Sequence, residues 1–130
     1  MRFTVSLKKN HEFRRLYSRG KNAASRFMVV YCRRNGRAES RVGITVSGKL
    51  GGAVRRNRMR RRLKETYRLC ERALSPGYDI VIVARQGCFD AAFGDLTRDF
   101  MKLTRRLGIS VSPAGARNAR GGGNAAAAAR

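Results

Sequence analysis

The stretch Ala53-Val-Arg-Arg-Asn-Arg-Met-Arg-Arg-Arg-Leu-Lys-Glu-Thr-Tyr-Arg68 opens the longest amphipathic pattern in the chain, and the other elements are placed outward from it. A glycine-rich bend at residues 48–52 comes before the pattern, and Ser75-Pro-Gly77 comes after it. Apolar residues recur every three or four positions between these two breaks, so we predict a helix over about residues 54–74. Its apolar stripe consists of Met59, Leu63, Tyr67 (or Thr66), Cys70 and Leu74.

The first turns of this predicted helix carry positive charge where the helix dipole is already positive. Each misplaced cation costs on the order of a few tenths of a kcal/mol, and like charges four residues apart, such as Arg56 and Arg60, add similar penalties. A bound phosphate would reverse both effects, because it favours the dipole and the guanidinium groups alike. We therefore interpret this end of the helix as a phosphate site on RNA or DNA rather than a solvated basic face. The cations are Arg55, Arg56, Arg58, Arg60, Arg61 and Arg62.

The whole chain shares this basic character. It has 130 residues, the length of about one domain, and a formal net charge of +22 from 30 Lys and Arg against 8 Asp and Glu. So many like charges repel one another in a compact domain, which implies a polyanionic partner. The excess of arginine over lysine fits phosphate recognition, and it fits a GC-rich genome equally well. Hydrophobic residues make up 42%, which excludes a wholly disordered protein.

Three strands are predicted around the basic helix. Residues 27–32 form a β-branched and aromatic run, and residues 41–47 alternate apolar with smaller or polar side chains. Because the turn residues Asn35-Gly36 lie between them, we predict that these two strands form a hairpin. Residues 78–84 are apolar nearly throughout, which is typical of a central strand.

Two more helices and a tail complete the predicted organisation. Residues 10–19 read as a short helix capped by Asn10, and residues 90–107 as a final amphipathic helix. Residues 113–130 are rich in Gly and Ala and poor in large apolar groups, so we expect a disordered tail after a single domain at 1–112. No apolar run reaches membrane-spanning length and no signal peptide is evident, so we expect a cytoplasmic protein.

The sequence does not contain a complete motif of a protein active site. Residues 43–49 fit GxxxxGK, but Leu50 stands where a phosphate-binding loop needs Ser or Thr, and the pattern between the glycines is that of a strand. Among the acids only Asp95 and Asp99 share a helix face, and His11 is the single histidine. We therefore predict no catalytic residue and no metal site. The three cysteines, Cys32, Cys70 and Cys88, lack metal-ligand spacing and are expected to be buried reduced thiols.

Aromatic residues allow a second inference about binding. Phe13 and Tyr17 lie one helical turn apart, and alternate residues of the first strand include Phe27, Val29 and Tyr31. Aromatic platforms beside Lys and Arg hold single strands of nucleic acid by stacking. Packing in the core is the other interpretation. For Phe13 the core and the stacking interpretations are equally supported, whereas the hydroxyls of Tyr17 and Tyr31 favour a surface position.

Residues 53–68 closely resemble the RNR motif of the bacterial ribonuclease P protein family. The likeness covers about residues 6–107. Leu7-Lys-Lys-Asn10 followed by Phe13, Tyr17 and Gly20 is similar to the family's N-terminal helix, residues 41–47 to its second strand, and residues 78–85 to its strand after the long helix.

The resemblance implies a fold and a function. The fold is α/β, an α+β two-layer sandwich in one compact domain with the order α-β-β-(β)-α-β-α and a left-handed crossover between parallel strands, contrary to the usual rule. The function is that of the protein subunit of ribonuclease P, which binds the catalytic RNA and the 5′ leader of precursor tRNA, aids removal of the leader and broadens the substrate range. In that family the RNA hydrolyses the phosphodiester bond with Mg²⁺, so the protein alone is expected to be inactive and to bind no cofactor.

By position, the resemblance assigns two groups of residues. The group for the catalytic RNA is Arg56, Asn57, Arg58, Arg60, Arg61, Lys64 and Arg68. The group for the leader cleft is Phe13, Tyr17, Val29 and Tyr31, bordered by Lys49 and Arg85. Met28 departs from the aromatic residue that relatives often have, and we expect it to face the core. The alternative is a structural RNA-binding protein of ribosomal type with a related α/β fold; a DNA-binding protein is more distant, because no helix-turn-helix is evident.

Overall fold

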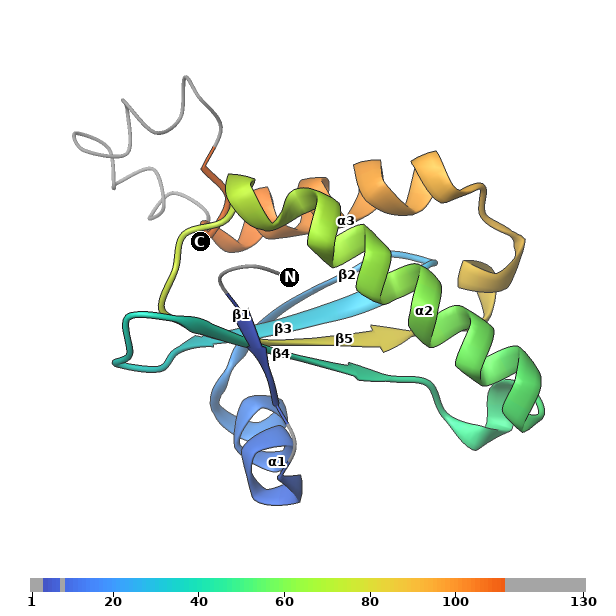
Figure 1. Cartoon of the computed structure of the whole chain (residues 1–130), viewed down its shortest axis with the longest axis horizontal. Helices are drawn as coiled ribbons and strands as arrows, with labels where there is room; N and C mark the ends of the chain where they lie inside the picture. Colours follow the sequence, from blue (N-terminus) through green and yellow to red (C-terminus); the bar gives the residue numbers. More distant parts are fainter. Residues whose placement is uncertain (1–3, 8, 112–130) are drawn as a thin grey trace.

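The structure is a computed structural model, and it describes residues 4–7 and 9–111 (Figure 1). The predicted tail at 113–130 lies outside the described residues. Short 3₁₀ turns occupy Gly48–Leu50, Glu71–Ala73 and Gln86–Asp90. The helices and strands are, in chain order, β1 (Thr4–Ser6), α1 (Asn10–Arg19), β2 (Lys21–Ala24), β3 (Met28–Arg34), β4 (Ser40–Thr45), α2 (Ala53–Cys70), β5 (Tyr78–Ala84) and α3 (Phe93–Leu107).

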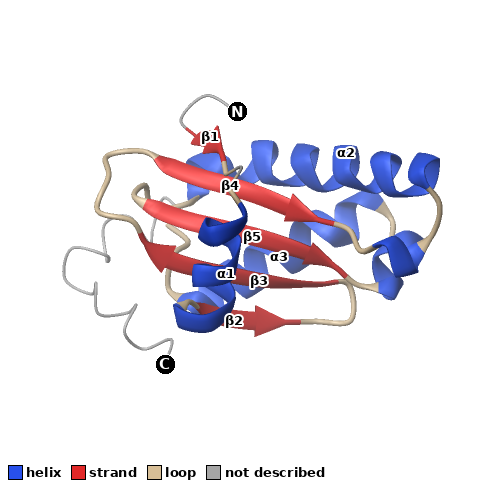
Figure 2. Cartoon of the chain, turned by 90° about the horizontal axis from the view of Figure 1, so that it is seen from below, coloured by secondary structure: helices blue, strands red, loops and turns tan. Residues whose placement is uncertain are grey.

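The described strands form one sheet with helices on both faces. Their order across the sheet is β1-β4-β5-β3-β2. Helices α2 and α3 lie over one face and enclose the large core, whereas α1 lies alone against the other face (Figure 1). The predicted α/β class, with two main layers, is confirmed. The small α1 layer leaves much of its face of the sheet uncovered (Figure 2).

The predicted hairpin between β3 and β4 is wrong. Strand β5 lies between them, antiparallel to β3 and parallel to β4. The reason is burial. Residues 80–82 of β5 are fully buried, and a central position allows the most apolar strand to be covered on both faces and paired along both edges. The connection at Asn35 runs past the start of β5 instead, where its N–H donates to the carbonyl of Gly77 at 2.9 Å. The central position predicted for residues 78–84 is confirmed.

The connection from β4 through α2 to β5 is left-handed. In Figure 2 the arrows of β4 and β5 point the same way while α2 passes behind the sheet, and the path from β4 to β5 turns in the left-handed sense. Parallel crossovers are right-handed in the great majority of proteins. The unusual hand implied by the resemblance is therefore confirmed. Since α2 follows β4 in the chain, it starts at the end of the sheet where β4 and β5 finish.

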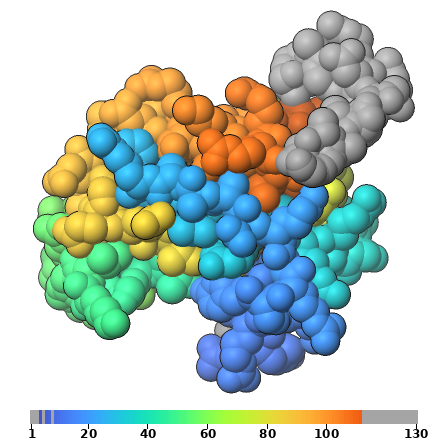
Figure 3. Space-filling model, turned by 180° about the vertical axis from the view of Figure 1, so that it is seen from behind, coloured from blue at the N-terminus to red at the C-terminus, as the bar shows by residue number. Residues whose placement is uncertain are grey.

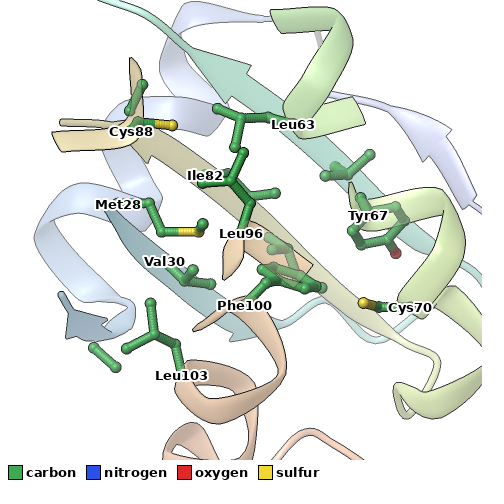
Figure 4. Close-up of a cluster of buried hydrophobic side chains, with 14 of the residues drawn as sticks. Met28, Val30, Leu63, Tyr67, Cys70, Ile82, Cys88, Leu96, Phe100 and Leu103 are labelled. Atoms are coloured by element: carbon green, nitrogen blue, oxygen red, sulfur yellow. The ribbon is translucent and has the colours of Figure 1, made fainter. Parts of the chain in front are cut away.

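The main core is built from alternate residues of the strands. Met28 and Val30 of β3 and Ile82 of β5 point toward α2 and α3, as Figure 4 shows. Met28 is fully buried there, as expected for that position. The helices contribute Leu63, Tyr67 and Cys70 from α2 and Leu96, Phe100 and Leu103 from α3.

The three cysteines are free thiols buried in this core, as predicted. Burial raises the pKa of Cys32, Cys70 and Cys88 to about 11 in each case. Such thiols stay protonated at neutral pH and behave as small apolar side chains.

Helix ends differ from the sequence-based expectation in three places. Helix α1 has the predicted bounds, but its N-cap is Lys9, so the cap assigned to Asn10 is wrong. Helix α2 ends at Cys70, four residues early, because the Glu71–Ala73 turn tightens the chain before Leu74. Helix α3 begins at Phe93 rather than near residue 90, because a 3₁₀ turn occupies the preceding segment.

Candidate nucleic-acid interface

The outer face of α2 holds cations that have no partner among the described residues. Met59, Leu63 and Tyr67 bury the inner face of the helix. On the outer side Arg58, Arg61 and Lys64 are exposed. None of these three forms a hydrogen bond or ion pair with another described residue. They can therefore bind phosphate without first breaking a contact within the described part of the protein. Arg58 lies nearest to the positive N-terminal end of the helix.

Two of the six arginines singled out in the sequence have a different role. The guanidinium of Arg55 stacks over the ring of Phe89 at 4.0 Å, and Arg62 Nη2 donates to the carbonyl of Ala91 at 2.8 Å. Both contacts join α2 to the segment before α3. Arg56 is also engaged, since its Nε donates to the carbonyl of Gly51 at 3.0 Å. The sequence analysis treated all six arginines as phosphate ligands, but Arg55 and Arg62 have a packing role within the protein.

The remaining members of the predicted group are tied only to neighbours on the helix. Arg60 Nη1 donates to Asn57 Oδ1 at 2.7 Å, and Arg68 pairs with Glu65 one turn earlier. The hydrogen bond from Arg68 lowers the pKa of Glu65. Solvent screens such surface contacts, so they orient the side chains without holding them against a competing phosphate. The predicted group thus lies on one helix, with Arg56 at its edge.

Helix α1 and the uncovered part of the sheet bring the predicted aromatic residues together. The rings of Tyr17 and Tyr31 meet edge to face, with centroids 5.0 Å apart and planes at 71°. The hydroxyls of Tyr17 and Thr45 share a hydrogen bond of 3.3 Å. Val29 lies opposite Val83 in the β3–β5 register, and both are partly exposed. Tyr17 is 41% exposed, so its ring offers a free edge to a ligand on this face.

Phe13 differs from the two tyrosines, because its ring closes over a glycine. A Cβ added to Gly43 would lie 2.5 Å from Cζ of Phe13. The ring also packs on the small cluster of Leu7, Leu16 and Val81 under α1. Phe13 is therefore first a packing residue that seats α1 on the sheet. Phe27, the third aromatic of the sequence pattern, packs against the main core instead.

Lys49 and Arg85 lie toward the end of the sheet where β4 and β5 finish. Arg85 follows Val83 by two residues along β5, and its Nη1 donates to the carbonyl of Ser25 at 3.1 Å. Lys49 is exposed on the turn between β4 and α2. In Figure 3 the surface is hollowed between α1, in blue, and the green segment at the start of α2. We use the name leader cleft, after the role predicted from the sequence, for the surface around the Tyr17–Tyr31 contact. Its residues are Tyr17, Val29, Tyr31, Thr45 and Val83, with Lys49 and Arg85 as its predicted border.

Arg41 holds α1 in place and was missed from the sequence. Its guanidinium donates to Asp79 through Nε at 2.8 Å and through Nη2 at 2.7 Å, and it also pairs with Glu12 of α1. Burial raises the pKa of Glu12, but the hydrogen bonds from Arg41 and from the Lys9 main chain outweigh it, and the pKa is lowered. Thr45 and Val83 were missed as well. No periodic signal marks these residues, since their partners are far apart in sequence.

Within residues 4–7 and 9–111 no group of three or more His, Cys, Asp or Glu side chains is arranged to hold a metal ion. In the same residues no helix combines the length and apolar character that crossing a bilayer requires.

Fold and surface together define a basic single-sheet α/β protein with a cationic helix face and a separate aromatic cleft. A family model described as Ribonuclease P matches residues 1–112. The ribonuclease P protein component of Clostridioides difficile is 45% identical over 109 residues, covering 83% of this chain and 96% of that protein. The protein component of Caldanaerobacter subterraneus is 45% identical over 102 residues, covering 78% and 88%.

Solved structures agree with the sequence relatives. The ribonuclease P protein from Thermotoga maritima superposes with a TM-score of 0.72 at 29% identity, covering 78% of this chain and 96% of that one. The Staphylococcus aureus protein gives 0.69 at 33% identity, covering 76% and 91%. The chain belongs to the bacterial ribonuclease P protein family. It is thus a subunit of the ribonucleoprotein endonuclease that matures the 5′ end of tRNA, and the ribosomal alternative is not favoured.

Proposed function

We propose that the outer face of α2 binds the catalytic RNA of ribonuclease P. The observation that carries this proposal is a set of exposed cations that have no partner within residues 4–7 and 9–111, namely Arg58, Arg61 and Lys64. Arg60, Asn57 and Arg68 extend the same face, and Arg56 lies at its edge. Their present contacts are with neighbours close in sequence, which a phosphate can replace.

The leader cleft then receives the single-stranded 5′ leader of precursor tRNA. Tyr17 and Tyr31 supply surfaces for stacking, Val29 and Val83 supply an apolar floor, and Lys49 and Arg85 supply charge for the backbone. Phe13 supports this site by seating α1 rather than by direct contact. The two RNA molecules can be bound at the same time, because α2 and α1 lie on opposite faces of the sheet (Figure 1).

In this proposal the chemistry belongs to the RNA subunit, which requires Mg²⁺, and the protein orients the two RNA molecules in the cytoplasm. The protein broadens the substrate range by adding leader contacts that do not depend on the tRNA body. Precursor tRNA incubated with Mg²⁺ and the protein alone should stay intact, and added catalytic RNA should restore cleavage. Cleavage by protein free of RNA would contradict this assignment.

A salt titration tests the α2 assignment. With about 6–10 phosphate contacts, affinity for the catalytic RNA should fall on the order of 10³-fold or more between 50 and 200 mM salt. The double variant Arg58→Ala/Arg61→Ala should reduce the slope of log affinity against log salt by about 1.4–1.8. Arg105→Ala/Arg106→Ala removes the same charge from exposed positions on α3 and serves as the control. Equal slopes for the two double variants would refute the assignment.

A further inference from the structure

A second depression lies on the other side of β4 from the leader cleft floor. It has a volume of about 420 Å³ and lies between α2 and the edge of the sheet near the end of β1. Ser6, Leu7, Val42, Gly43 and Ile44 line it on the sheet side. Asn57, Arg60, Arg61 and Lys64 line it on the side of α2. We call it the edge pocket.

The two sides of the edge pocket differ in chemistry. The sheet side is apolar: Leu7 and Val42 are 5% and 3% exposed, and the half-buried Ile44 presents the larger accessible apolar side chain. We call these three residues the apolar floor. The opposite wall carries the positive charge of Arg60, Arg61 and Lys64. A flat apolar group attached to an anion matches this combination, because it can lie on the floor while its charge meets the wall.

The sheet edge in the pocket also offers main-chain hydrogen bonds. Strand β1 pairs with β4 only as far as Ser6 opposite Val42, and Figure 2 shows the remaining edge of β4 beyond it. The N–H of Leu7 donates to the carbonyl of Val42 at 2.8 Å, so the main chain of Val42 is directed to this edge. In a strand, every second residue is directed the same way, which turns the N–H and carbonyl of Ile44 toward the pocket.

We propose that the edge pocket takes one unpaired nucleotide of the catalytic RNA. Its base lies on Leu7, Val42 and Ile44, with the polar edge of the base toward the Ile44 main chain, and its flanking phosphates meet Arg60, Arg61 and Lys64. A paired base is unsuited to this place, because its faces are already covered by stacking in the helix. The proposal rests on the α2 assignment, since the basic face is what brings the RNA to the pocket.

A titration of the full chain tests the pocket without any variant. The methyl resonances of Leu7, Val42 and Ile44 are followed by NMR during addition of adenosine, guanosine, cytidine or uridine 5′-monophosphate. Ribose 5-phosphate, which carries the phosphate but no base, is the control. At least one mononucleotide should produce ring-current shifts of the Ile44 and Leu7 methyl groups that the control does not. Shifts of the same size with ribose 5-phosphate, or no methyl shifts at all, would overturn the proposal.

A blocked pocket extends the test to the catalytic RNA itself. Ser6 is exposed at the pocket, so Ser6→Trp should fill the space, abolish the base-dependent methyl shifts and weaken binding of the catalytic RNA on the order of tenfold. The salt slope should stay unchanged, because no cation is removed. Ser18→Trp, at an exposed position on α1, should bind as the wild type does.

The two proposals fail in different ways. Wild-type binding of the catalytic RNA together with equal binding by Ser6→Trp would overturn the edge pocket and leave the α2 assignment standing. An unchanged salt slope in Arg58→Ala/Arg61→Ala would overturn the α2 assignment, whereas the mononucleotide titration would still decide whether the pocket holds a base.

Discussion

The ring of Phe13 lies directly over Gly43, so closely that a Cβ at position 43 would come within 2.5 Å of Cζ of the ring. This contact couples helix α1 to strand β4 and brings Tyr17 of the same helix to the hydroxyl of Thr45. A side chain at position 43 would lift α1 and change the shape of the leader cleft. The glycine is thus a condition for the proposed site as well as for the packing.

Replacing Gly43 with alanine should weaken both stability and leader binding. Overpacking of this kind costs about 1–3 kcal/mol, which urea unfolding would measure, and the preference for precursor over mature tRNA should fall. Gly48→Ala is the matched control, because a Cβ there meets nothing within 4 Å. If Gly43→Ala unfolded at the wild-type urea concentration, the close seating of Phe13 would be wrong.

Replacing Tyr17 with alanine should affect the leader and hardly affect the fold. Loss of one stacking platform should weaken binding of precursor tRNA by about 1–3 kcal/mol and leave mature tRNA unchanged. Tyr31→Ala should likewise weaken binding of precursor tRNA but not of mature tRNA. Its loss of stability should be larger, because Tyr31 is half-buried. Tyr67→Ala is the contrasting core variant, fully buried against Phe100 and expected to cost about 3–5 kcal/mol of stability. A lowered melting temperature with an unchanged precursor-to-mature ratio would return Tyr17 to the core.

Acid should loosen α1 through Glu12. Its pKa is lowered from the ordinary value of 4.5, because the hydrogen bonds from Arg41 and Lys9 outweigh the effect of burial. A lowered folded-state pKa stabilises the fold above the unfolded-state value, and the contribution is lost as pH falls through the folded-state pKa. The stability difference between wild type and Glu12→Gln should therefore be largest above pH 4.5 and shrink at lower pH. If this stability difference did not change with pH, the Glu12–Arg41 ion pair would not be a source of the stability.

Two arginines of α2 should separate stability from RNA binding. Arg62→Ala removes a hydrogen bond to the carbonyl of Ala91 and should cost about 1–2 kcal/mol in unfolding free energy. Arg58→Ala removes no contact within the described part of the protein and should leave stability nearly unchanged. For binding to the catalytic RNA, Arg58→Ala should have the larger effect of the two variants. The slope of log affinity against log salt should be smaller for Arg58→Ala than for Arg62→Ala. If one variant had the larger effect on both stability and RNA binding, the separate roles of Arg58 and Arg62 would be contradicted.

Short edge strands and helix ends were the parts of the fold that sequence patterns missed. β1 and β2 have three and four residues, too few to show an alternating pattern, and pairing with the longer strands β4 and β3 forms them. The hairpin prediction failed for a related reason. Patterns of local sequence identify strands but carry little information on which distant strand will lie between two neighbours.

The sequence by itself determined the long basic helix, the apolar strand at residues 78–84 and the cationic group on α2, because periodicity and charge are local properties of consecutive residues. Only the tertiary structure decided that Arg55 and Arg62 join α2 to the segment before α3 while Arg58 stays free of partners among the described residues. It also decided that Phe13 covers Gly43 and that Arg41 joins Glu12 to Asp79. These roles depend on contacts between residues about 30 or more positions apart, and packing of the whole chain alone brings such residues together.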